Sequence, residues 1–144
     1  MSSTLVETLN IQNITWHRRP RESGGGGGVA IAIRNSFGNS IDLNPPNPDN
    51  IECKWCLISP AGFPSLKLLV ASFYISNTTG HTPAPGTVVK HILETVSFYQ
   101  NRFPHLYTVL AGDYNKRNFN DIYSSDFMSV YKKYYCYTAA VMQH

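Results

Sequence analysis

The spacing of apolar residues changes partway along this chain, and the change limits the folds open to it. Three segments before residue 75 have the apolar, β-branched pattern of strands: 29–33, 52–59 and 66–74. From Thr87 the spacing becomes that of a helix, which we expect to end near Arg102. The apolar side of this predicted helix consists of Val89, Ile92, Leu93, Val96 and Phe103.

A short apolar strand at 107–111 follows the predicted helix. The predicted order is therefore strand, strand, strand, helix, strand. Hairpin-like antiparallel connections come first, and a crossover helix precedes the last strand. This order favours an α/β sandwich with mixed sheets over a doubly wound parallel sheet. Residues 35–50 are rich in Asn, Pro and Gly, and we expect a loop there with at most one short extended stretch.

Composition sets the broad class of the protein. A chain of 144 residues fits one domain, and 42% apolar with 15% charged residues is enough to bury a core. The net charge of +3 permits an anionic partner without requiring one. No run approaches the roughly 18 apolar residues of a membrane span, and the N-terminus lacks a signal-peptide pattern. Three cysteines fit a reducing compartment, so we expect no membrane or secretory destination and an intracellular protein, nuclear or cytoplasmic.

Cys53 and Cys56 have the spacing of half a zinc site. If 52–59 is a strand, alternate residues point to opposite faces, which puts Cys53 on one face and Cys56 on the other. Two thiols on opposite faces cannot bind one tetrahedral ion, and no second pair completes a set of four. The pattern therefore favours two structural cysteines over a zinc ligand pair.

The segment Gly112-Asp113-Tyr114-Asn115 directly follows an apolar strand. A carboxylate and an amide two residues apart in extended chain project to the same side, so Asp113 and Asn115 can reach one phosphate together. Phosphodiester hydrolysis needs such a carboxylate for the attacking water and neutral donors for the developing charge. We expect Gly112 to let the backbone approach the ligand closely. The alternative is that these residues simply form the turn that ends a strand.

Tyr74 ends another predicted strand, and Asn77 lies on the loop after it. A phenol and an amide can both donate to phosphate oxygens. The alternative for Tyr74 is a packed amphipathic aromatic residue. The five glycines at 24–28 are not a P-loop because no Gly-Lys-Ser/Thr closes them; they are either a flexible linker or a tight connection into the strand that follows.

The order of these landmarks resembles the endonuclease/exonuclease/phosphatase-type domain of non-LTR retrotransposons. The matching segments are Arg18, Arg19 and Arg21 with the glycine run and Val29–Arg34, then Glu52–Ile58, Leu68–Tyr74 and Gly112–Asn115. The resemblance covers about residues 11–115. It implies a partial four-layered α/β sandwich of two packed mixed sheets with flanking helices, assigned to residues 1–120. The tyrosine-rich segment 121–144 stays unassigned.

In function, the resemblance implies Mg²⁺-dependent cleavage of a DNA phosphodiester by part of a larger reverse transcriptase polyprotein. Carried over residue by residue, Asp113 aligns or deprotonates the water, and Asn115 binds phosphate or a metal-bound oxygen beside it. Tyr74 contacts the scissile phosphate, and Asn77 contacts a DNA phosphate from its loop. The DNA phosphate backbone is thus the expected partner.

The chain departs from this family at both ends. Glu7-Thr8 has the letters of the family's metal-binding Glu but lies too close to Ile11; Glu7 is therefore either a Mg²⁺ ligand or a solvated N-terminal residue. Ser125-Asp126-Phe127 lacks the histidine of the closing motif. We therefore expect a fragment, truncated at both ends, with an impaired or inactive site.

Two alternatives to that interpretation stay open from the sequence alone. One is a complete nuclease or phosphatase that draws its ligands from unusual positions such as Glu7 and Asp126. The other is a non-catalytic phosphate-backbone-binding or scaffold domain on the same fold. Its DNA contacts would come from Arg18, Arg19, Arg21 and Arg34.

Overall fold

The computed structural model describes residues 13–21, 28–47, 50–76, 80 and 83–113, and the backbone of 137–139. Its α-helix within these residues is α2 (Pro85–Gln100), and a 3₁₀ turn, η1 (Asn35–Phe37), follows β2. The strands are β1 (Ile14–Pro20), β2 (Gly28–Arg34), β3 (Gly38–Leu43), β4 (Glu52–Pro60), β5 (Lys67–Tyr74), β6 (Leu106–Asp113) and β7 (Tyr137–Ala139).

These strands form two sheets. β1 and β2 pair antiparallel as a two-stranded sheet, and β3-β4-β5-β6-β7 form a mixed five-stranded sheet. β3, β4 and β5 are antiparallel neighbours, whereas β6 runs parallel to β5 after the α2 crossover. The predicted hairpin-like connections followed by one crossover are confirmed. β7, which falls in the segment left unassigned above, pairs parallel with β6.

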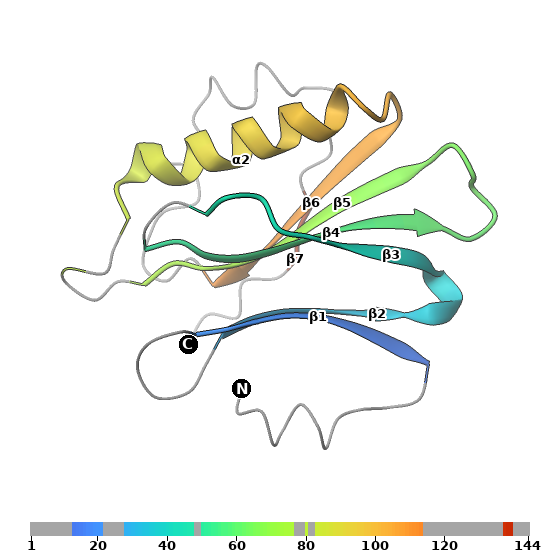
Figure 1. The fold of residues 1–144 in the computed structure, drawn as a ribbon, viewed down its shortest axis with the longest axis horizontal. Helices are drawn as coiled ribbons and strands as arrows, with labels where there is room; N and C mark the ends of the chain where they lie inside the picture. Colours follow the sequence, from blue (N-terminus) through green and yellow to red (C-terminus); the bar gives the residue numbers. More distant parts are fainter. Residues whose placement is uncertain are drawn as a thin grey trace.

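The two sheets and the helix are stacked as layers, with the five-stranded sheet between α2 and the β1–β2 pair (Figure 1). The larger core fills the space between α2 and the five-stranded sheet. Its buried members include Trp55, Leu57, Leu69, Ala71, Phe73, Val88, Ile92, Val96, Leu106 and Leu110. The smaller core lies on the opposite face, where Ile31 and Ile33 of β2 pack with Cys56 and Ile58. The fold is therefore an α+β sandwich, in agreement with the prediction.

Alternation along β4 decides which core each of its residues enters. Cys53, Trp55 and Leu57 contribute to the core under α2, whereas Cys56 and Ile58 face the β1–β2 sheet. This confirms the predicted opposite orientation of the two thiols, which cannot share one metal ion.

α2 begins with Pro85 at its first turn, where the missing backbone N–H has no intrahelical partner in any case. Its buried side is centred on Val88, Ile92 and Val96, with Val89 and Leu93 at the margins. The predicted helix is thus confirmed, although its core-facing stripe includes Val88, which the sequence pattern had not singled out. Within the described residues, no helix is long and apolar enough to cross a membrane.

Besides β7, the sequence pattern did not single out β1, and it allowed only a short extended stretch where β3 lies. β1 pairs with β2 over seven residue pairs, and β3 occupies part of the segment expected to be a loop. In both strands the positions that face the neighbouring sheet include polar residues, His17 and Arg19 in β1 and Ser40 and Asp42 in β3. β1 and β3 therefore lack the alternating apolar pattern that predicts a strand, and they depend on polar contacts between the sheets.

Candidate functional site

Of the five predicted site residues, Tyr74 and Asp113 belong to the part of the chain that the structure describes. Tyr74 is the last residue of β5 and Asp113 is the last residue of β6. Asn115, Asn77 and Glu7 lie outside the described residues.

The register of the sheet places Tyr74 beside Asp113. The two strands are parallel, Tyr74 and Asp113 are direct partners in their ladder, and the Ile75 N–H donates to the Asp113 carbonyl at 2.9 Å. Residues paired across a ladder project to the same face, so both side chains belong to the face that looks toward the β1–β2 sheet. The carboxyl ends of two neighbouring strands therefore bring a phenol and a carboxylate together.

Two further residues join this pair. Glu52, the first residue of β4, is the ladder partner of Tyr74 on its other side. Arg21, just after β1, donates from Nε to Glu52 Oε1 at 2.7 Å and from Nη2 to Oε2 at 3.3 Å. Its guanidinium carbon also lies 5.1 Å from the centroid of the Tyr74 ring. We call these four residues, Arg21, Glu52, Tyr74 and Asp113, the strand-end face.

The electrostatics of the strand-end face are dominated by the Arg21–Glu52 pair. The hydrogen bond to Glu52 raises the pKa of Arg21, partial burial opposes this, and the charge on Glu52 and the nearby Tyr74 add to the rise. Both side chains are about 30% exposed, so water screens the pair and its contribution to stability is about 1 kcal/mol or less. The main consequence of this ion pair is the position of its members: Arg21 is held over the Tyr74 ring, and both oxygens of Glu52 accept hydrogen bonds from Arg21.

The neighbouring strand requires a glycine at position 112. Its φ is +150°, and a Cβ at this position would lie 2.7 Å from Phe73 N and 2.8 Å from Phe73 C. Real side chains do not approach backbone so closely, so glycine is required here for β6 to pair with β5. The close approach is thus to a neighbouring strand, and the pairing it permits is what sets Asp113 beside Tyr74.

Mg²⁺ can be tested against the residues present. Within the described ranges, no group of three or more His, Cys, Asp or Glu side chains is arranged to hold a metal ion. Mg²⁺ often takes only one or two protein carboxylates and completes its shell with water and substrate phosphate oxygens. Asp113 fits that requirement, whereas Glu52 does not while Arg21 engages both of its oxygens.

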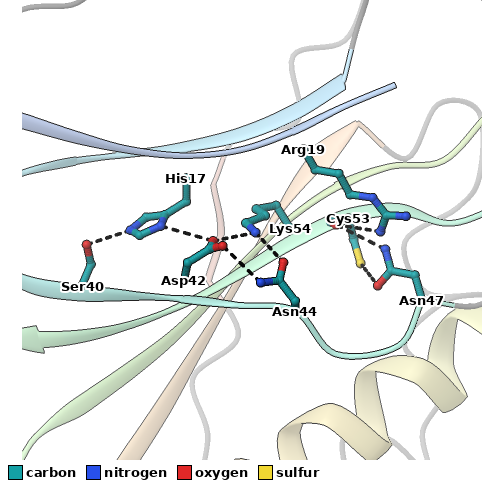
Figure 2. A network of polar contacts seen from close by, with 8 residues as sticks. All are labelled: His17, Arg19, Ser40, Asp42, Asn44, Asn47, Cys53 and Lys54. Carbon is teal, nitrogen blue, oxygen red and sulfur yellow. Dashed lines mark hydrogen bonds and ion pairs between the residues drawn. The ribbon is translucent and has the colours of Figure 1, made fainter. Parts of the chain in front are cut away.

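A second group of polar side chains lies between the two sheets (Figure 2). Lys54 is almost fully buried, with its Nζ 2.5 Å from Asp42 and donating to Asn44 at 2.9 Å. His17 lies between Ser40, at 2.7 Å, and Asp42, at 3.3 Å. Partial burial acts to raise the pKa of Asp42, but the hydrogen bonds from Lys54 and Asn44 and the nearby charges outweigh it, and the pKa is lowered.

A cleft of about 330 Å³ opens beside this network. Its polar lining comes from Arg18 and Arg19 of β1, Asn44 and Asn47 of the β3–β4 connection, and Lys54 of β4; Trp55 also lines it. We call this the β1–β4 cleft. Arg19 donates weakly to the Cys53 carbonyl at 3.5 Å, and Asn47 donates to the same carbonyl at 3.4 Å (Figure 2).

Cys53 and His91 are adjacent, with Sγ 3.4 Å from Nε2, but they are not poised as a nucleophile and base. Burial raises the pKa of Cys53 to about 11 and lowers that of His91, so both groups are held neutral. His91 Nε2 also accepts a hydrogen bond from Trp55 Nε1 at 3.1 Å, which leaves the ring proton on Nδ1. The pair is therefore part of the core under α2.

The sequence pattern did not single out Glu52, Lys54 or Asp42 as site residues. Glu52 and Lys54 alternate on β4 in the same way that Arg19 and Arg21 alternate around the end of β1. When a strand is otherwise apolar, charged residues at every second position indicate a polar region between two sheets.

The chain was compared with models of known protein families, with curated proteins and with solved structures. None of the three comparisons gives a match.

Proposed function

We propose that the strand-end face is the site of a DNA phosphodiesterase of the kind that non-LTR retrotransposons carry, with little cutting activity of its own. The observation that supports this most is the register that sets Tyr74 beside Asp113 at the ends of two parallel strands. The order of the sequence landmarks supplies the substrate class. No other pair of predicted catalytic residues is described by the structure.

Each residue of the face suits one part of phosphodiester hydrolysis. Asp113 orients the attacking water or accepts its proton, because it is a carboxylate at a strand end. Tyr74 donates its hydroxyl to a phosphate oxygen, and Arg21 above its ring offers positive charge to the same group. Mg²⁺, when bound, would supply further charge neutralisation at the phosphate.

The slow rate follows from the Arg21–Glu52 pair. A carboxylate whose two oxygens accept from a guanidinium is neutralised and cannot readily serve as a ligand or base. Arg21, in turn, must leave Glu52 before it can form a paired contact with phosphate. Substrate binding therefore competes with an existing ion pair.

A single-turnover plasmid-nicking assay tests the proposal. The full chain with Mg²⁺ should nick slowly, and Asp113→Ala should reduce the rate to the uncatalysed background. Glu94→Gln is the matched control, since it removes one carboxylate from an exposed position on α2 and should nick like the wild type. Equal rates for wild type and Asp113→Ala would reject the endonuclease proposal.

The second candidate is a phosphate-backbone-binding domain that does not cut. The observations that favour it are that Arg21 already engages the Glu52 carboxylate and that Arg18 and Arg34 are exposed. It predicts salt-sensitive DNA binding that Asp113→Ala leaves unchanged or strengthens, because removing a negative charge cannot weaken attraction to DNA.

A further inference from the structure

The β1–β4 cleft is lined by three cationic residues, Arg18, Arg19 and Lys54. None of the described residues that line it is acidic; the nearest acidic group in the described network, Asp42, lies against Lys54. Alternation along β1 turns Arg19 toward the larger sheet and Arg18 away from it, so Arg19 and Lys54 carry the charge of the cleft. One negative charge does not cancel two positive ones, so the cleft keeps a positive potential. Its ligand is therefore an anion.

The donors in the cleft retain capacity for a ligand. An ammonium group has three donors, and Asp42 and Asn44 engage two of those on Lys54. A guanidinium has five donors, and Arg19 gives one of them to the Cys53 carbonyl in a long contact of 3.5 Å. Lys54 is held nearly immobile by its partners, so one wall of the cleft is organised before any ligand binds.

The volume and the lining residues of the cleft indicate which class of anion it can bind. About 330 Å³ is at the lower end of the range for small-molecule pockets and suits a phosphate with part of its attached sugar. Arginines and a lysine with neutral amides are the groups that contact phosphate in proteins that bind nucleic acid. A phosphate group is thus the chemistry that the lining matches best.

The position of the cleft indicates a phosphate of a strand rather than a free one. Lys54 is two residues from Glu52 on β4, and Arg19 is two residues before Arg21. Alternate residues on a strand are roughly 6.7 Å apart, so the cleft and the strand-end face are immediate neighbours. A nucleic acid strand whose one phosphate lies at Tyr74 can place a neighbouring phosphate in the cleft.

We propose that the β1–β4 cleft is a second phosphate subsite, which binds a phosphodiester of a DNA strand next to the one at the strand-end face. The choice of DNA rests on the proposed function, whereas the phosphate chemistry rests on the cleft alone. The two claims can fail separately, because binding is measurable without Mg²⁺ and without cutting.

The test measures fluorescence anisotropy of a labelled single-stranded oligothymidylate with the full chain in EDTA. Arg18→Gln/Arg19→Gln should weaken binding about ten-fold, the effect expected for losing a charge-assisted hydrogen bond. The slope of log Kd against log salt should also fall by about 0.7 for the lost phosphate contact. Lys90→Gln/Arg102→Gln is the matched control, since it also removes two positive charges, from exposed side chains that do not line the cleft.

Competition with inorganic phosphate distinguishes a site for a phosphate of a DNA strand from a site for free phosphate. If the oligonucleotide binds equally to the cleft variant and to Lys90→Gln/Arg102→Gln, the strand subsite is rejected, and phosphate bound by the wild type alone would identify a free-anion site. Arg19→Gln by itself, which removes the β1 cation that faces the cleft, serves if the double variant loses its circular dichroism spectrum. A cleft-dependent affinity with no nicking would reject the endonuclease proposal and leave this one standing.

Discussion

Replacing Gly112 with alanine is expected to separate β6 from β5 at the end that carries Asp113. The residue has φ of +150°, and its missing side chain faces the backbone of Phe73. An alanine there meets two penalties, an unfavourable backbone conformation and an overlap with the neighbouring strand.

Gly62 isolates the first of these penalties. It also has positive φ, +81°, but nothing lies within 4 Å of a Cβ built there. Gly62→Ala should therefore cost about 1 kcal/mol, from a left-handed conformation partly offset by the lower entropy of the unfolded chain. Gly112→Ala should cost about 2–4 kcal/mol, because an overpacked contact adds about 1–3 kcal/mol.

Urea unfolding followed by tryptophan fluorescence measures the difference. Trp55 packs edge-on against Phe73 with ring centroids 5.7 Å apart, so its emission reports on the affected region. The Gly112→Ala variant should unfold at a clearly lower urea concentration than Gly62→Ala, and its nicking rate should fall with it. Equal free energies of unfolding for the two variants would refute the β5–β6 register on which the strand-end face depends.

Three further predictions concern buried polar groups. Burial raises the pKa of Cys53 from an ordinary 9.0 to about 11, which lowers its thiolate population about 100-fold. Iodoacetamide should therefore modify Cys53 readily only after unfolding, and peptide mass spectrometry measures this modification. Burial lowers the pKa of His91 below its usual 6.5, so the unfolded chain gains a proton first as pH falls. Stability should therefore decline below pH 6.5 by up to about 1.4 kcal/mol per pH unit, and less steeply in His91→Gln. Lys54→Met leaves half-exposed Asp42 without its closest cation and should lower the free energy of unfolding by about 1–2 kcal/mol, measured by thermal or urea unfolding. The control Lys90→Met, at an exposed position, should leave the free energy of unfolding unchanged.

The apolar parts of this fold are predictable from the sequence because a local pattern determines them. Alternation along β4 places Trp55 and Cys56 on opposite faces without knowledge of any other strand. The helical spacing after Thr87 likewise marks α2. Tyr74 and Asp113 could be recognised as strand ends for the same reason.

The polar parts could not be predicted, because partners far apart in the sequence determine them. β1 has no apolar stripe facing the larger sheet; His17 is buried because Ser40 and Asp42 of β3 satisfy its ring nitrogens. Arg21 and Glu52 are 31 residues apart, and only the packing of β1 on β4 brings them together. The need for glycine at position 112 in the pairing of β6 with β5 could not be predicted for the same reason, since the atoms that require it belong to Phe73 of another strand.

A double-mutant cycle on Tyr74 and Asp113 tests the central claim most directly. Single-turnover nicking rates with Mg²⁺ are measured for wild type, Tyr74→Phe, Asp113→Asn and the double variant. If both side chains act on one phosphate, the loss in the double variant is close to that of the worse single variant. Losses that multiply independently, or rates unchanged in all three variants, would contradict a shared site at the two strand ends.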